Sequence, residues 1–302
     1  MKVHLVDGTY ELFRHHFGVP PEGREEGDTA AGTRGVLWSV LQLIEEGATH
    51  VGVATDHVIE SFRNDMWPGY KSSAGVPDVL LAQFGLLEEA LEAMGVAVWA
   101  MVDLEADDAL AAAARIAAAD PAVEQVLILT PDKDLAQCVQ AQRVVQVDRR
   151  VKTVTDEDGV RLRYGIGPES IPDWLALVGD SADGFPGIAG WGKKSASAVL
   201  ARYPHLEDIP EFGFRWDLDL RGRDRLAATL VENRHLALLF RDLATLRSEE
   251  PVLDQVERLR WTGPTSALEE VAPRIRAWRL VERVAKAAAE RSGSGDDGPS
   301  GR

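Results

Sequence analysis

The sequence has little positive charge and almost no cysteine. Its 302 residues include 33 Lys and Arg against 49 Asp and Glu, a formal net charge of −16. A protein that coats nucleic acid by general attraction to phosphate would need the opposite balance. Cys138 is the one cysteine, so no internal disulfide can form, and a reducing compartment such as the cytoplasm suits the chain.

Long apolar runs and zinc-binding patterns are also missing. No run reaches the length of a membrane span, which argues against a membrane partner. The segment from Met1 to Asp7 predicts a strand rather than a signal peptide. The seven histidines are scattered, without the His/Cys spacing of a zinc site. Residues 292–302 are rich in Gly, Ser and Asp, which predicts a disordered tail.

The first half of the chain alternates short apolar runs with helical patterns. Strands are expected at residues 3–6, 51–54, 96–99 and 126–129, and helices at 33–46, 79–94 and 105–119. This rhythm predicts an α/β fold with a mostly parallel sheet and helices on both faces. After about residue 165, helical patterns at 172–178, 193–203, 222–247 and 267–292 predict an α-helical subdomain.

Acidic residues gather where the predicted strands end. Carboxyl ends of parallel strands meet at one edge of a sheet, so these side chains should converge there. Like charges held together repel unless a cation neutralises them, and Mg²⁺ prefers such oxygen ligands. Two ions would suit in-line displacement at a phosphodiester bond. The candidate metal ligands are Asp7, Asp56, Glu105, Asp107, Asp108, Asp132, Asp134, Asp180 and Asp183.

Each acid taken singly has a simpler interpretation. One Asp after a strand is usually a turn residue or a helix N-cap, and acids in a first helical turn complement the helix dipole. Caps alone do not require the cluster of Glu105, Asp107 and Asp108 together with the Asp132 and Asp134 pair. The complete set therefore favours a metal centre.

Two other segments carry basic residues suited to phosphate. Arg63 and Lys71 follow Asp56 and are candidates for contact with a scissile phosphate, while Tyr70 could stack on an unpaired base. An ordinary surface loop is the competing interpretation. The second segment is glycine-rich and precedes a helix, whose N-terminus offers free N–H groups to phosphate. Its candidate contacts are Gly187, Gly190, Gly192, Lys193, Lys194 and Ser195; the competing interpretation is a plain helix–helix connection.

Five motifs in order resemble the 5′-to-3′ exonuclease and flap endonuclease family, including the 5′ nuclease domain of bacterial repair DNA polymerases. They extend from residue 3 to about 200. They are Leu5-Val6-Asp7-Gly8, Phe62-Arg63 with Gly69-Tyr70-Lys71, Glu105-Ala106-Asp107-Asp108, Thr130-Pro131-Asp132-Lys133-Asp134-Leu135, and Gly179-Asp180-Ser181-Ala182-Asp183-Gly184-Phe185-Pro186-Gly187 leading into Gly190-Trp191-Gly192-Lys193-Lys194-Ser195-Ala196.

The resemblance implies a PIN-like catalytic core over 1–165, with an arch or lid at 57–78. A DNA-binding helical subdomain would follow over 166–291, with a helix–three-turn–helix at 178–203. It also implies Mg²⁺ in two or more sites, with Mn²⁺ as a substitute, and K⁺ at the helix–three-turn–helix. The expected substrates are 5′ ends, flaps and branched duplexes of DNA, with RNA primers in hybrids as a further partner. We expect a monomeric, stand-alone nuclease acting in replication and repair.

Two departures from the family pattern bear on activity. Ser72-Ser73-Ala74-Gly75 stand where the family often has basic residues, and Gly184 follows Asp183 where it often has Asn. The scarcity of basic residues leaves one alternative open, a DNA-junction binding protein with little catalysis. A PIN-like RNA nuclease is a further alternative. A pure binder, however, would gain from losing carboxylates near phosphate.

Overall fold

A computed structural model describes residues 1–18 and 27–293 of the chain. Its six strands form one sheet in the order β3-β2-β1-β4-β5-β6, in which only β6 runs antiparallel to its neighbour. The chain moves from β1 out to β3 and then returns to the other side of β1, so the strand order switches between β1 and β4. The strands are β1 (Lys2–Asp7), β2 (His50–Asp56), β3 (Ala97–Met101), β4 (Gln125–Leu129), β5 (Val144–Asp148) and β6 (Thr153–Thr155).

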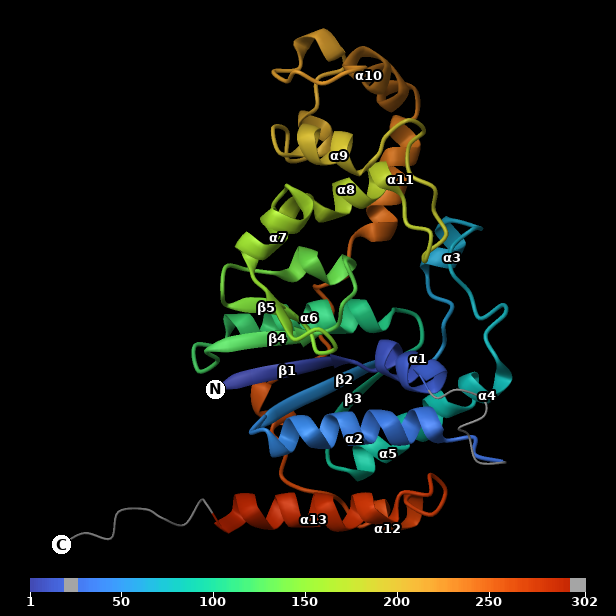
Figure 1. Cartoon of the computed structure of the whole chain (residues 1–302), viewed down its shortest axis with the longest axis vertical. Helices are drawn as coiled ribbons and strands as arrows, with labels where there is room; N and C mark the ends of the chain where they lie inside the picture. Colours follow the sequence, from blue (N-terminus) through green and yellow to red (C-terminus); the bar gives the residue numbers. More distant parts are fainter. Residues whose placement is uncertain (19–26, 294–302) are drawn as a thin grey trace, which may run out of the picture.

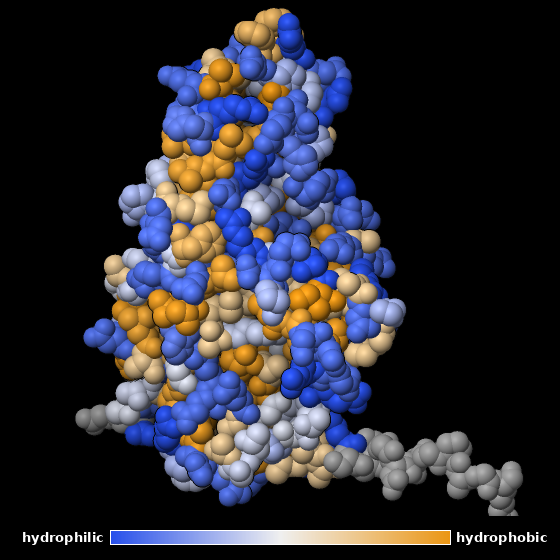
Figure 2. Space-filling view, turned by 180° about the vertical axis from the view of Figure 1, so that it is seen from behind, coloured by the Kyte–Doolittle hydropathy of each residue, from blue (hydrophilic) through white to orange (hydrophobic). Residues whose placement is uncertain are grey.

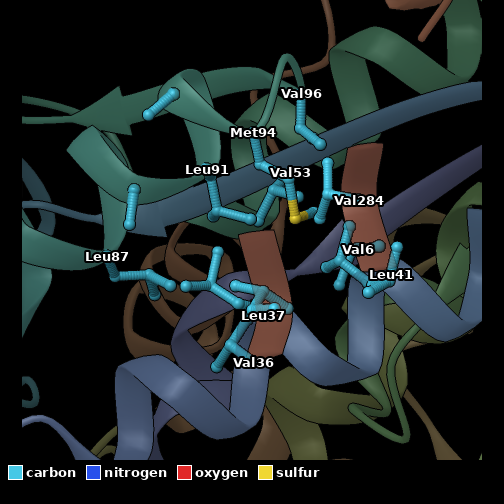
Figure 3. Close-up of a cluster of buried hydrophobic side chains, with 14 of the residues drawn as sticks. Val6, Val36, Leu37, Leu41, Val53, Leu87, Leu91, Met94, Val96 and Val284 are labelled. Atoms are coloured by element: carbon cyan, nitrogen blue, oxygen red, sulfur yellow. The ribbon is translucent and has the colours of Figure 1, made fainter. Parts of the chain in front are cut away.

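Helices cover both faces of this sheet (Figure 1). On one face α2 (Ala31–Glu45) and α5 (Gln83–Ala93) pack against Val6 and Val53, as Figure 3 shows. On the other face the alanine-rich α6 (Ala106–Ala119) packs against Leu5 and Ile128. Every residue of β2 is buried, as expected for a central strand covered on both faces. The remaining helices of this part are α1 (Gly8–Gly18), α3 (Arg63–Met66) and α4 (Asp78–Leu81).

A second unit, built only of helices, stands on the α6 side of the sheet (Figure 1). Its core gathers the buried aromatic residues Trp174, Phe185, Trp191, Trp216 and Phe240. Its helices are α7 (Glu157–Tyr164), α8 (Ile171–Val178), α9 (Lys193–Leu200), α10 (Arg223–Glu232) and α11 (Arg234–Ala244). The predicted α/β core followed by a helical subdomain is therefore confirmed.

The last helices do not belong to that helical unit. After α11 the chain returns along the α/β part, where Leu246, Val256 and Leu259 join the core beneath α6. Helices α12 (Ala267–Val271) and α13 (Trp278–Gly293) then pack beside α5 and α2, and bury Leu280 and Val284 there (Figures 1 and 3). The expected subdomain over 166–291 is corrected accordingly, because residues beyond about 245 bury their apolar faces against the α/β part.

Local differences from the sequence predictions have simple causes. Strands β5 and β6 were not predicted, since β5 carries the polar Gln146 in its middle and β6 has only three residues. The predicted helix at 222–247 is two helices that meet at Asn233, and the one at 267–292 is interrupted around Pro273. The predicted tail at 292–302 lies outside the described residues from 294 onward.

Hydrophilic and hydrophobic residues are interspersed over the face shown in Figure 2. Among the described residues, the structure has no helix both long and apolar enough to cross a bilayer.

Candidate metal centre and nucleic-acid interface

Four strand ends deliver carboxylates to the carboxyl edge of the sheet. Asp7 is the last residue of β1 and Asp56 the last of β2, while Asp132 follows β4 and Asp107 opens α6 after β3. Two of these acids also cap helices. An oxygen of Asp7 accepts the backbone N–H of Tyr10 at 2.8 Å, and an oxygen of Asp56 accepts that of Ala106 at 2.7 Å. The capping interpretation and the metal interpretation therefore apply to the same side chains.

Asp7, Asp56, Asp107 and Asp132 form what we call the first acidic group. Burial and the nearby carboxylates of Asp132 and Asp56 raise the pKa of Asp7 to about 7. Burial and the charges of Asp132 and Asp7 raise the pKa of Asp107 well above its usual range. Within the part of the chain that the structure describes, no lysine or arginine forms an ion pair with any of these four acids. The group therefore carries repulsion that a bound cation would relieve.

Asp134, Asp180 and Asp183 form the second acidic group. One carboxylate oxygen from each lies within 4.8 Å of the others. Asp134 follows β4 in the α/β part, whereas Asp180 and Asp183 follow α8 in the helical unit, so this group joins the two units. Burial and the charges of Asp132, Asp183 and Asp180 raise the pKa of Asp134 well above its usual range.

Asp108 lies apart from both groups. Its carboxylate is fully buried and accepts two hydrogen bonds from the Arg63 guanidinium, at 2.8 and 2.7 Å. It also accepts the backbone N–H groups of Glu105 and Arg247. Although burial opposes it, this guanidinium lowers the pKa of Asp108. We correct the expected metal role of Asp108, because its oxygens are already used inside the protein.

The predicted contact of Arg63 with a phosphate is corrected for the same reason. Its side chain is 1% exposed and also donates to the carbonyl oxygens of Leu243 and Thr245, at 2.8 and 3.2 Å. No face of the guanidinium is available to a phosphate. Arg63 instead joins the start of α6 to the end of α11, and a phosphate-binding role was inferred only because the sequence does not show which arginines are buried.

Tyr70, Lys71 and Glu105 meet beside the first group. Tyr70 is 5% exposed within the core of the helical unit, so it cannot stack on a base, and that expectation is corrected. Its hydroxyl donates to Glu105 at 3.3 Å. The Lys71 ammonium lies 2.7 Å from a Glu105 oxygen and 3.5 Å from Asp183, and its side chain keeps 26% exposure. Lys71 thus joins Glu105, at the start of α6, to Asp183 of the second acidic group, and its side chain still reaches solvent.

The segment 57–78, expected to be an arch or lid, is fastened to the helical unit. The Trp67 indole N–H donates to the carbonyl of Gly184 at 3.0 Å, and the backbone N–H of Lys71 donates to that of Asp183 at 3.0 Å. Gly184 has φ of +83°, and a Cβ there would overlap the Gly69 carbonyl. The glycine that departs from the family pattern is therefore needed for this close approach, which the sequence did not reveal.

The glycine-rich turn leads into α9 as predicted. Gly187 and Gly190 have positive φ, and Gly192 precedes the first helical residue. Lys193 and Lys194 are exposed at the N-terminus of the helix, and the Ser195 hydroxyl accepts the Gly192 N–H at 3.0 Å. This end presents positive charge and a helix N-terminus to solvent on the unit that also carries Asp180 and Asp183.

The residues of the two acidic groups fit a divalent metal ion. All of the donors are carboxylate oxygens, the ligands that hard cations prefer. A buried oxygen of Asp134 has no hydrogen-bond partner, which is costly unless a cation satisfies it.

Sequence comparisons identify the family and relatives of the chain. The family described as "5′-3′ exonuclease, N-terminal resolvase-like domain" matches residues 2–165, and that described as "5′-3′ exonuclease, C-terminal SAM fold" matches residues 166–267. DNA polymerase I of Pseudomonas aeruginosa is 33% identical over 265 residues, which cover 84% of this chain and 28% of the polymerase. The chain spans between a quarter and a third of the length of the curated relatives it matches.

Solved structures show the same fold. A bacteriophage T5 flap endonuclease, in a pseudo-enzyme–product complex with DNA and metal ions, matches with a TM-score of 0.64 at 18% identity, covering 93% of this chain and 100% of that one. Human GEN1, in complex with Holliday junction DNA, matches with a TM-score of 0.63 at 12% identity, covering 99% and 75%. The family matches, which together span residues 2–267, decide the assignment: the chain belongs to the 5′-3′ exonuclease family.

Proposed function

We propose that the protein is a divalent-metal-dependent hydrolase that acts as a 5′-3′ exonuclease and 5′-flap endonuclease on DNA. The observation that carries the proposal is the pair of acidic groups beside the carboxyl edge of the sheet, together with Lys71, a half-buried cation that contacts Glu105 and Asp183. Membership in the exonuclease family and structural relatives solved with DNA and metal ions support it. A protein that only binds DNA would be weakened by unneutralised carboxylates facing phosphate.

The division of labour follows from the contacts of each side chain. The two acidic groups would hold divalent ions, whose chemistry would be to lower the pKa of an attacking water and to offset charge on the leaving oxygen. Lys71 places its ammonium where a phosphate between the groups would be bound, and Glu105 orients that ammonium. Arg63 and Asp108 act at a distance, because they fix the first turn of α6, on which Asp107 stands.

In this proposal the helical unit binds duplex DNA. The N–H groups at the start of α9 and the ammonium groups of Lys193 and Lys194 suit the backbone phosphates of one strand. Since the rest of the chain is strongly acidic, binding would depend on this surface and on the shape of the junction more than on bulk attraction.

Cleavage of a defined substrate tests the proposal. Purified protein is incubated with a duplex that carries a labelled 5′ flap, in Mg²⁺ and in EDTA, with a 3′-flap duplex of the same sequence as the control. We expect cutting at the base of the 5′ flap and stepwise loss from a 5′ end, only with Mg²⁺. Tight junction binding in EDTA without cleavage in Mg²⁺ would instead establish the binding protein.

The double variant Lys193→Met with Lys194→Met tests the binding of DNA by the start of α9. The control is Lys286→Met, which changes an exposed lysine on α13. We expect DNA affinity to fall about tenfold, and the slope of log affinity against log salt to become shallower by about 1.8, because each phosphate contact contributes about 0.9. An unchanged slope in the double variant would remove these lysines from the interface.

The finer assignments belong to the same proposal. We propose Mg²⁺ as the working ion, with Mn²⁺ able to replace it, and K⁺ at backbone carbonyls of the turn 187–192. The protein would act as a monomer in the cytoplasm, and accept RNA flaps on DNA as in primer removal. Flaps of identical sequence in DNA and RNA test the acceptance of RNA, and assays of each flap in K⁺ and in Na⁺ test the K⁺ site.

A further inference from the structure

Lys133 is the residue between Asp132 and Asp134, and it has no part in the proposed reaction. It stands one residue before the 3-10 turn Asp134–Cys138, and its side chain keeps 31% exposure. The Lys133 ammonium contacts a carboxylate oxygen of Asp180 and lies 3.7 Å from an oxygen of Asp134. Both acids belong to the second acidic group, so the ammonium lies against two of the carboxylates that a metal ion would use there.

The first acidic group has no such cation. Among the described residues, Lys133 forms its ion pairs only with members of the second group. A lysine ammonium carries its positive charge at neutral pH, because the ordinary pKa of lysine lies far above neutral. The two groups thus differ in whether the chain supplies its own positive charge.

We propose that Lys133 is a built-in counter-ion that competes with a divalent cation for the second acidic group. The inference rests on the proposed function, since it concerns the same carboxylates. An ammonium and a divalent ion cannot use the same oxygen of Asp180 together, and their like charges repel at such separations. The ion must therefore displace Lys133, and the second group binds it more weakly than the first. Without the ion, Lys133 ties Asp134 of the α/β part to Asp180 of the helical unit.

Metal binding in the absence of DNA tests this competition. Mn²⁺ is titrated into wild type and Lys133→Met, with the free ion followed by electron paramagnetic resonance. For the wild type we expect a tighter and a weaker site; Lys133→Met should tighten the weaker site by about tenfold. Lys133→Arg keeps the charge and should bind as the wild type does. Damage to the fold would weaken binding, so a gain in affinity separates competition from a structural role.

A second readout is the midpoint of thermal unfolding. In EDTA, Lys133→Met should melt below the wild type because the second group loses its counter-ion, and saturating Mn²⁺ should restore it. Equal or weaker Mn²⁺ binding in Lys133→Met would overturn the inference while leaving the proposed function intact. A wild-type protein that binds no Mn²⁺ would overturn both.

Discussion

The carboxylates at the start of α6 divide into two regions with opposite surroundings. Asp107 faces Asp7 and Asp132, and its pKa is raised by burial and by those charges. Asp108, the next residue, is held by the Arg63 guanidinium and has a lowered pKa. Asp107 and the carboxylates that repel it form what we call the repulsive region, whereas Asp108 and the groups that bond to it form the paired region. The difference separates acids that await a cation from acids that hold the protein together.

The largest effect should come from a substitution in the repulsive region. Asp132→Asn keeps a carbonyl oxygen that can accept the Asp134 N–H, bonded at 3.0 Å in the wild type, but removes a charge from the first group. We expect cleavage of a 5′ flap to fall on the order of 1000-fold, since an ion-binding carboxylate is lost. The melting temperature in EDTA should stay the same or rise, because like-charge repulsion falls. Single-turnover cleavage and thermal unfolding measure the two.

The matched control is Asp103→Asn, an exposed acid shortly before α6 that should leave cleavage unchanged. If Asp132→Asn cleaves normally, or if it unfolds in EDTA as a structural residue would, the division into two regions fails.

A substitution in the paired region should lower the stability of the protein. Arg63→Met removes the guanidinium that neutralises buried Asp108 and bonds Glu105 at 3.1 Å. Breaking a buried ion pair from one side costs about 3–5 kcal/mol. We expect a loss of that size in the free energy of unfolding, measured in urea.

The double variant Arg63→Met with Asp108→Leu should recover part of this loss, because no buried charge is then left alone. If Arg63→Met instead cleaves poorly at full stability, Arg63 acts on the substrate, as the sequence suggested, and not only on Asp108.

This division explains what the sequence could predict. The alternation of strand and helix patterns predicted β1 to β4 and the edge of the sheet where their carboxyl ends meet, because the spacing of apolar residues reports directly which residues are buried. The acids were found from their positions after strands. Which of them are paired depends on contacts across the fold: Arg63 reaches Asp108 over 45 positions and Leu243 over 180. Likewise, α12 and α13 read as helices, but the pattern of an amphipathic helix does not identify the surface that it covers.

The pH dependence of stability in EDTA should report on the repulsive region. A carboxyl pKa raised in the folded state, such as that of Asp7 at about 7, means that the folded protein binds more protons than the unfolded one between about pH 4 and 7. The free energy of unfolding therefore falls as pH rises through that window. We expect a loss on the order of 1–2 kcal/mol between pH 5 and 7 in EDTA.

Saturating Mg²⁺ should remove most of this slope, because the ion favours the ionised carboxylates. Asp132→Asn should flatten it in EDTA. A protein whose stability in EDTA rises steadily from pH 5 to 7 would show that paired acids dominate the whole edge.

The smallest effect should appear where the two regions touch. Glu105 accepts Arg63 and the Ser61 hydroxyl on one oxygen, the latter at 2.6 Å, and Tyr70 and Lys71 on the other. Ser61→Ala removes one of these bonds and leaves every charge in place, so stability should fall by about 1 kcal/mol. Cleavage should decline only a few-fold, because Lys71 still holds the other oxygen. A loss of cleavage as large as that in Asp132→Asn would mean that the orientation of Glu105, rather than the charge of the first group, limits the reaction. Glu105 would then belong to both regions.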